Sequence, residues 1–142
     1  MISVKDSPFY KDVLKEFNYN HGDVFVFDGF VVSENNYGIT YTWDDHGKKV
    51  VDDIVDFFGK TGNNLVYISN RINSYAVKPN DWLKFFSHSY SIRGYGVVSR
   101  TRGGVMNTMI ENLFFNKKIQ RFNSLDAAIY WARNKEITEA IE

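Results

Sequence analysis

Polar side chains that could bind a ligand gather in the short segment 69–75. This segment follows the continuous apolar run Leu65–Ile68, which is typical of a strand buried on both faces. Ligands of open α/β sheets bind at the carboxyl ends of strands, where this segment would begin. We therefore predict a ligand- or partner-binding site built from five of its side chains: Asn70, Arg71, Asn73, Ser74 and Tyr75. The alternative is that these groups bond to the backbone of a long connection, with the arginine paired to an acidic neighbour.

A second segment, 99–104, follows the expected strand 92–99 and carries Arg100 and Arg102 before two glycines. Arginines beside the free N–H groups of a helix start suit an anion such as phosphate. The segment is not a Walker loop, because the closing Lys-Ser/Thr is missing. If both strands are parallel neighbours, both segments lie at one edge of the sheet and give it a positive potential. The alternatives are a solvated turn, or neutralisation of the arginines by Asp44 or Asp45.

Other chemistries lack a signature in this sequence. The three histidines, His21, His46 and His88, do not show the spacing of a metal site. There is no Gly-x-Ser-x-Gly elbow, and without cysteine there can be no thiolate or disulfide chemistry. We therefore expect no metal, no cofactor and no catalysis. An enzyme whose catalytic groups converge only in three dimensions remains an alternative.

Composition limits the class of protein. The 142 residues suit one domain over 1–142, and 44% hydrophobic with 17% aromatic residues indicate a well-packed core. Basic and acidic residues balance at 17 each, which argues against nucleic-acid binding. No apolar stretch is long enough to span a membrane, and the first residues lack the apolar core of a signal peptide, so we expect a cytoplasmic location.

Hydrophobic patterns predict the elements that position these segments. The runs 24–27 and 30–32 flank Asp28-Gly29, a strong hairpin signal, and alternation predicts a strand at 39–43. Residues 8–19 are ambiguous: Ser7 and Pro8 could open a helix, yet 13–19 alternate like a strand. Further strands are expected at 65–68, in the centre of the sheet, at 92–99, and at 119–122, at the edge of the sheet. Helices are expected at 46–58, 80–88, 104–116 and 124–140, the last with four residues facing inward: Leu125, Ala128, Ile129 and Ala132. This alternation predicts an α/β fold with a largely parallel second part, in which Ile68 and Ile110 are buried.

Two stretches carry a family resemblance. Phe122-x-Ser124-Leu125-Asp126-x-Ala128-Ile129-x-Trp131-Ala132 looks like the last strand and helix of SpoIIAA-like (STAS-type) proteins. Residues 66–75 resemble a group of short bacterial members of Bacteroidetes type, and the likeness covers about 13–133. It implies a mixed sheet with N-terminal strands and four alternating helices, and it favours a strand at 13–19.

The resemblance also implies candidate functions. STAS proteins are anti-anti-sigma factors switched by phosphorylation of a serine after the central strand, for which Ser74 is the nearest equivalent, although its Asp-x-Ser-Gly surroundings are missing. Their architecture is similar to CRAL-TRIO lipid-transfer domains, so a carrier with an apolar pocket lined by Phe85, Phe86 and Met109 is an alternative. Our preferred prediction is a non-catalytic binding or regulatory module that receives a protein partner or a small anionic ligand.

Overall fold

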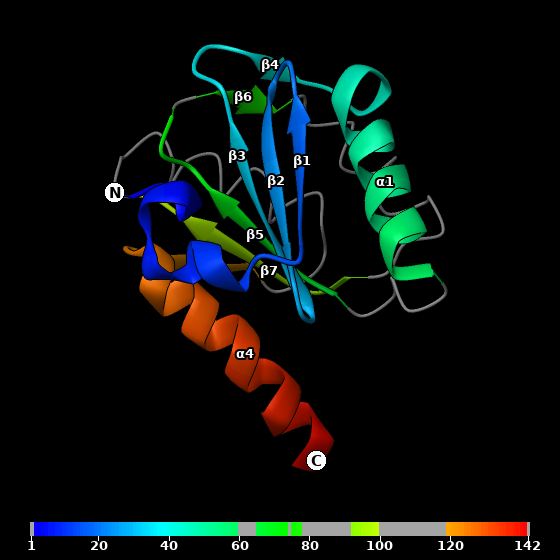
Figure 1. Ribbon diagram of the computed structural model, residues 1–142. Coiled ribbons are helices and arrows are strands. Elements are labelled where there is room, and N and C mark those ends of the chain that lie inside the picture. Colours follow the sequence, from blue (N-terminus) through cyan, green and yellow to red (C-terminus); the bar gives the residue numbers. More distant parts are fainter. Residues whose placement is uncertain (1, 60–64, 74, 78–91, 100–118, 142) are drawn as a thin grey trace.

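The computed structural model describes residues 2–59, 65–73, 75–77, 92–99 and 119–141. A mixed six-stranded sheet has helix α1 against one face and helix α4 against the other (Figure 1). The strands are β1 (Lys15–Tyr19), β2 (Gly22–Phe27), β3 (Phe30–Asn35), β5 (Leu65–Asn70), β7 (Ile92–Val98) and β8 (Ile119–Phe122). The helices are α1 (Lys48–Phe58) and α4 (Leu125–Ile141). The α/β class is therefore confirmed.

The sheet combines an antiparallel and a parallel half. Its order is β1-β2-β3-β5-β7-β8, with β1, β2 and β3 antiparallel and the remaining neighbours parallel. The Asp28-Gly29 turn joins β2 to β3 as predicted, and Gly29 adopts a φ of 84°, which side chains with a Cβ rarely adopt. Strand β5 is central and β8 lies at the edge, so both of these predictions are confirmed.

The side chains of β5 alternate between two apolar clusters. Leu65 and Tyr67 pack on the face covered by α1, whereas Val66 and Ile68 pack on the face covered by α4. Because both faces are covered, every residue of this strand is buried, as its continuous apolar run predicted. Ile68 is fully buried, and Ile110 lies outside the described residues.

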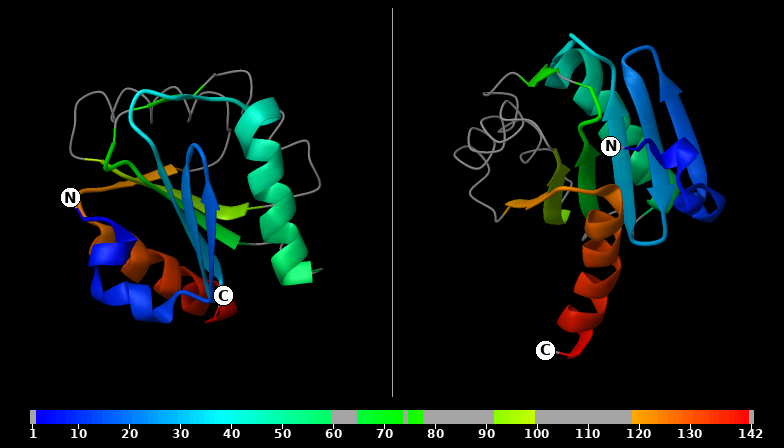
Figure 2. Two further views of the ribbon diagram at one scale, coloured as in Figure 1. Left: turned by 45° about the horizontal axis from the view of Figure 1, so that its top comes forward. Right: turned by 90° about the vertical axis from the view of Figure 1, so that its left-hand side faces the viewer.

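The ambiguous opening segment contains both kinds of structure. Two short 3₁₀ helices, η1 (Val4–Asp6) and η2 (Pro8–Asp12), precede β1. The hydroxyl of Ser7 accepts a hydrogen bond from the Phe9 amide at 3.2 Å, so it caps η2 as its position suggested. These turns lie beside α4 (Figure 2), where the Arg133 guanidinium is 3.3 Å from the Asp12 carboxylate.

Helices α1 and α4 agree with two of the four expected helices. In α1, Val50, Val51 and Ile54 are buried, and Gly59 ends the helix with a φ of 65°. In α4, the four residues expected to face inward are all buried: Leu125, Ala128, Ile129 and Ala132. The expected helices 80–88 and 104–116 lie outside the described residues. Neither described helix is long and apolar enough to cross a membrane.

The expected strand at 39–43 is wrong at its carboxyl end. Strand β4 covers only Thr40–Tyr41 and pairs in parallel with β6 (Ala76–Val77) in a separate small sheet. Trp43 instead opens a turn of π-helix, η3 (Trp43–Gly47), which leads directly into α1. The Thr42 hydroxyl accepts a hydrogen bond from the Asp45 amide at 3.2 Å, and this cap ends the extended conformation before Trp43.

Candidate anion-binding edge of the sheet

The two predicted binding segments begin at the same edge of the sheet. Strands β5 and β7 are adjacent and parallel, and Asn70 lies opposite Val98 in their register. The Arg71 amide continues the pairing by donating to the Val98 carbonyl at 3.0 Å. The expected common edge is therefore confirmed for the two strands. Arg100, Arg102 and Ser74 lie outside the described residues.

Arg71 is a buried cation at the end of the central strand. Its side chain lies over the ring of Tyr75, with the guanidinium carbon 4.7 Å from the ring centre, and the residue is 7% exposed. Burial opposes its charge, but electrostatic interaction and hydrogen bonding with Tyr75 and Tyr95 outweigh this and raise the pKa of Arg71. The guanidinium therefore stays charged in surroundings of low polarity.

The hydroxyls of Tyr75 and Tyr95 interact with this cation and belong to a larger polar and aromatic cluster. The hydroxyls of Ser69 and Tyr75 share a hydrogen bond of 2.8 Å. The rings of Tyr67 and Tyr95, on the neighbouring strands β5 and β7, stack with their centres 5.6 Å apart. Burial raises the pKa of Tyr95, so its phenol remains protonated and can donate a hydrogen bond. An arginine among such donors is a suitable arrangement for binding an oxyanion.

Asn70 belongs to β5 and not to a loop. It is 1% exposed, and its side-chain amide donates to the Ile2 carbonyl at 3.0 Å and to the Glu34 carboxylate at 2.8 Å. The first bond holds the N-terminal segment at this edge, and the second joins β5 to Glu34 of β3. These bonds join Asn70 to the N-terminal segment and to β3, and not to the backbone of the connection after β5 that the alternative interpretation named. Its Oδ1 atom is buried and accepts no hydrogen bond from the residues that the structure describes.

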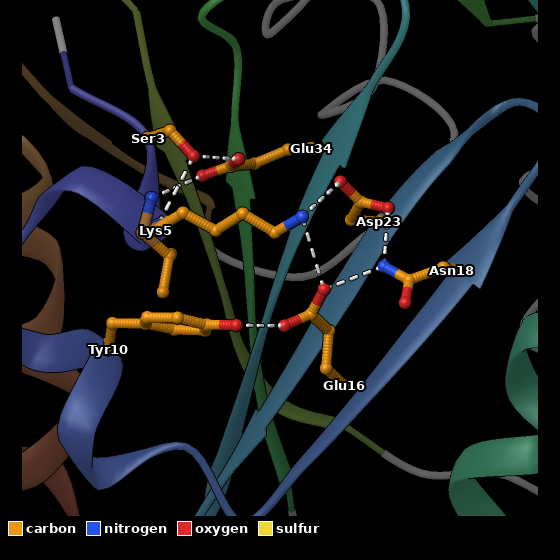
Figure 3. A network of polar contacts seen from close by, with 8 residues as sticks. Ser3, Lys5, Tyr10, Glu16, Asn18, Asp23 and Glu34 are labelled. Atoms are coloured by element: carbon orange, nitrogen blue, oxygen red, sulfur yellow. Dashed lines mark hydrogen bonds and ion pairs between the residues drawn. The ribbon is translucent and has the colours of Figure 1, made fainter.

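Glu34 is the centre of this N-terminal attachment, and the sequence did not single it out. Besides Asn70, it accepts hydrogen bonds from the Ser3 hydroxyl at 2.7 Å and the Val4 amide at 2.8 Å (Figure 3). The carboxylate is buried at the carboxyl end of β3, beside β5. Its three donors offset the cost of burying a charge, so the Glu34 carboxylate serves to attach the N-terminal segment.

Asn73 and Arg121 complete the described part of the edge. The Asn73 amide donates to the Asn35 carbonyl at 3.2 Å, which ties the segment after β5 to the end of β3. The Arg121 guanidinium donates to the Ser99 carbonyl at 2.9 Å from the exposed edge strand β8. Sequence reasoning did not select Arg121, although its strand runs parallel to β7 and ends at the same edge. The structure thus brings together Asn70, Arg71, Asn73 and Tyr75 and adds Ser69, Tyr95 and Arg121.

Two histidines treated as scattered in the sequence are in contact. The rings of His21 and His46 lie 4.6 Å apart, although 24 residues separate them in the chain. No group of three or more histidine, aspartate or glutamate side chains within the described residues could hold a metal ion. His88 lies outside those residues.

Comparison of the chain with family models, with curated proteins and with solved structures finds no match.

Proposed function

We propose that this protein is a non-catalytic binding or regulatory module that receives a small anionic ligand at the carboxyl edge of β5 and β7. One observation carries the proposal: a charged guanidinium, that of Arg71, is buried at the end of the central strand against Tyr75. In such surroundings the attraction between an arginine and an anion is much stronger than in water.

The burial of Arg71 favours a small ligand over an acidic protein surface. A guanidinium on a residue that is 7% exposed presents little area to a partner protein. A sulfate, phosphate or carboxylate group is small enough to approach it and can accept two parallel hydrogen bonds from one guanidinium. The Ser69–Tyr75 hydroxyl pair and the Tyr95 phenol belong to the same cluster, and Arg100 and Arg102 are proposed to add further positive charge.

The same proposal includes a regulatory role, in which the module is switched by phosphorylation. The resemblance to STAS-type proteins suggests a phosphoswitch, with Ser74 as its acceptor. Ser74 follows Arg71 by three residues in the chain, and a phosphate on Ser74 is proposed to pair with the guanidinium. The edge would in that case bind a phosphate attached to the chain in place of a free anion.

Titration with sulfate tests the proposal. Sulfate keeps its charge over the whole working pH range, and binding is followed by the backbone amide signals of residues 69–73 and 95–99. We expect saturable shifts that centre on Arg71 and disappear in Arg71→Gln, which retains hydrogen-bond donors but has no charge. Arg133→Gln is the matched control, because Arg133 is an exposed arginine on α4, paired with Asp12. Equal shifts in both variants, or no saturable shifts in the wild type, would contradict the proposal.

A further inference from the structure

An aromatic cluster joins the β1–β2 turn to the start of α1. The ring of His21, in the turn, stacks on Tyr19 with ring centres 5.1 Å apart. His46, in η3, stacks on Tyr41 of β4 with ring centres 5.2 Å apart. The two imidazoles meet at 4.6 Å and so connect the two halves of the cluster.

His46 also caps the turn in which it lies. Its Nδ1 atom accepts a hydrogen bond from the Thr42 amide at 2.9 Å. In return, the Thr42 hydroxyl accepts from the Asp45 amide at 3.2 Å, and the Thr42 carbonyl accepts from the His46 amide at 3.1 Å. This reciprocal arrangement resembles a capping box in which an imidazole nitrogen replaces the usual glutamate or glutamine oxygen.

The imidazole differs from a glutamine in that protonation removes its acceptor. A proton on Nδ1 would face the Thr42 N–H, so two donors would meet and the hydrogen bond would be lost. The new charge would also lie in the first turn of the helical segment, where the helix dipole disfavours a cation. Because the two imidazoles are in contact, a state in which both rings carry a charge is energetically unfavourable.

We propose that His46 and His21 form an acid-sensitive latch, which holds β4 and the start of α1 against the β1–β2 turn and opens when His46 is protonated. The latch depends on the neutral imidazole of His46, because only an unprotonated Nδ1 accepts the hydrogen bond of the Thr42 amide. Burial and the neighbouring His46 lower the pKa of His21 to about 4, so His21 stays neutral at pH 5.

Other titratable groups lie around the latch on β1, β4 and α1. Tyr19 on β1 donates from its phenol to the Asp53 carboxylate at 2.7 Å, and Lys49 on α1 lies 3.0 Å from the same carboxylate. Tyr41 on β4 keeps its proton, because burial raises its pKa. The charged groups nearest to His46 in sequence are the exposed Asp44, Asp45 and Lys48.

Opening of the latch would affect the candidate anion site through β4. Strand β4 pairs with β6, which begins at Ala76, directly after Tyr75. Tyr75 carries the ring that packs on Arg71. Loss of the latch would therefore loosen the support of that ring and weaken anion binding at acidic pH. This consequence for binding rests on the proposed function, whereas the latch itself does not.

Amide hydrogen exchange at Thr42 tests the latch directly. Protection of this amide, corrected for the intrinsic effect of pH, should fall about tenfold between pH 7.5 and pH 5, as expected for one lost hydrogen bond. His46→Asn places an amide oxygen where Nδ1 lies and cannot titrate, so its protection should be equal at both pH values. His46→Leu has no acceptor and should show low protection at both. Unchanged protection in the wild type, or an equal fall in His46→Asn, would overturn the proposal.

Sulfate binding separates the latch from the anion site. We expect the wild type to bind sulfate several-fold more weakly at pH 5 than at pH 7.5, and His46→Asn to bind equally at both. Equal weakening in the two proteins would overturn the coupling between the latch and the site. Absence of binding at both pH values would contradict the proposed function. Exchange of the Thr42 amide would still show whether the latch exists.

Discussion

The Arg71 guanidinium lies 4.7 Å from the centre of the Tyr75 ring, and the Tyr75 hydroxyl in turn bonds to the Ser69 hydroxyl at 2.8 Å. This chain of contacts folds the segment after β5 back over the end of its own strand. It orients a buried cation through an aromatic face and a hydroxyl pair. We expect removal of the Tyr75 hydroxyl to lower mainly the stability, and removal of the Arg71 charge to lower mainly the affinity for sulfate.

Tyr75→Phe should destabilise the protein by about 1–3 kcal/mol, because it removes the buried hydroxyl that bonds to both Ser69 and Arg71. The ring remains beneath Arg71, so sulfate affinity should fall less than in Arg71→Gln. Chemical denaturation measures the first effect and sulfate titration the second. Tyr130→Phe, at an exposed tyrosine of α4, is the matched control and should change neither. Wild-type stability in Tyr75→Phe would mean that the Ser69–Tyr75 bond contributes nothing.

Glu34→Gln should loosen the N-terminal segment. The neutral amide would retain one acceptor oxygen and direct N–H groups either toward Ser3 or toward the donors of Val4 and Asn70, at a cost of about 1–3 kcal/mol. Limited proteolysis near residues 2–7 should become faster, and the midpoint of denaturation should fall. Glu16→Gln is the matched control, since Glu16 lies in an exposed network with Lys5 and Tyr10. Equal effects of the two changes would contradict a special role for the buried carboxylate.

Ile68→Ala should destabilise the protein by about 2–5 kcal/mol, because Ile68 is fully buried in the cluster beneath α4 and its truncation leaves a cavity. Leu14→Ala removes a side chain that is 57% exposed and should change the free energy of unfolding by no more than about 0.5 kcal/mol. Denaturant titration of both variants makes the comparison. Similar values would show that β5 is not the centre of the core.

Stability should fall as the pH decreases from about 6.5 to about 4 through the contribution of His21. Burial and the neighbouring His46 lower the pKa of this imidazole in the folded protein to about 4, below the ordinary histidine value. The unfolded chain therefore takes up the proton first, and protonation in this range favours unfolding. His21→Phe keeps a ring for stacking on Tyr19 and removes the titration, so its free energy of unfolding should depend less on pH over this range. Identical pH profiles would exclude His21 as a contributor.

Local patterns in the sequence were sufficient to predict much of the framework. The Asp28-Gly29 hairpin, the buried run of β5 and the inward face of α4 each depend on neighbours in the chain, through turn chemistry or hydrophobic period. The same local reasoning identified the edge where β5 and β7 end together. The resemblance to STAS-type proteins added a strand at 13–19, where β1 lies, but the family itself remains a prediction.

Tertiary structure decided where the individual polar groups are used. Asn70 was expected to face a ligand but bonds to Ile2 and Glu34, because the N-terminal segment returns to the end of β3. His21 and His46 meet only because β4 passes the β1–β2 turn before η3 begins. Such contacts depend on long-range pairing and on side-chain packing, neither of which leaves a periodic signal in the sequence. The sequence by itself determined the elements and the edge, and the folded chain determined which side chains hold that edge together.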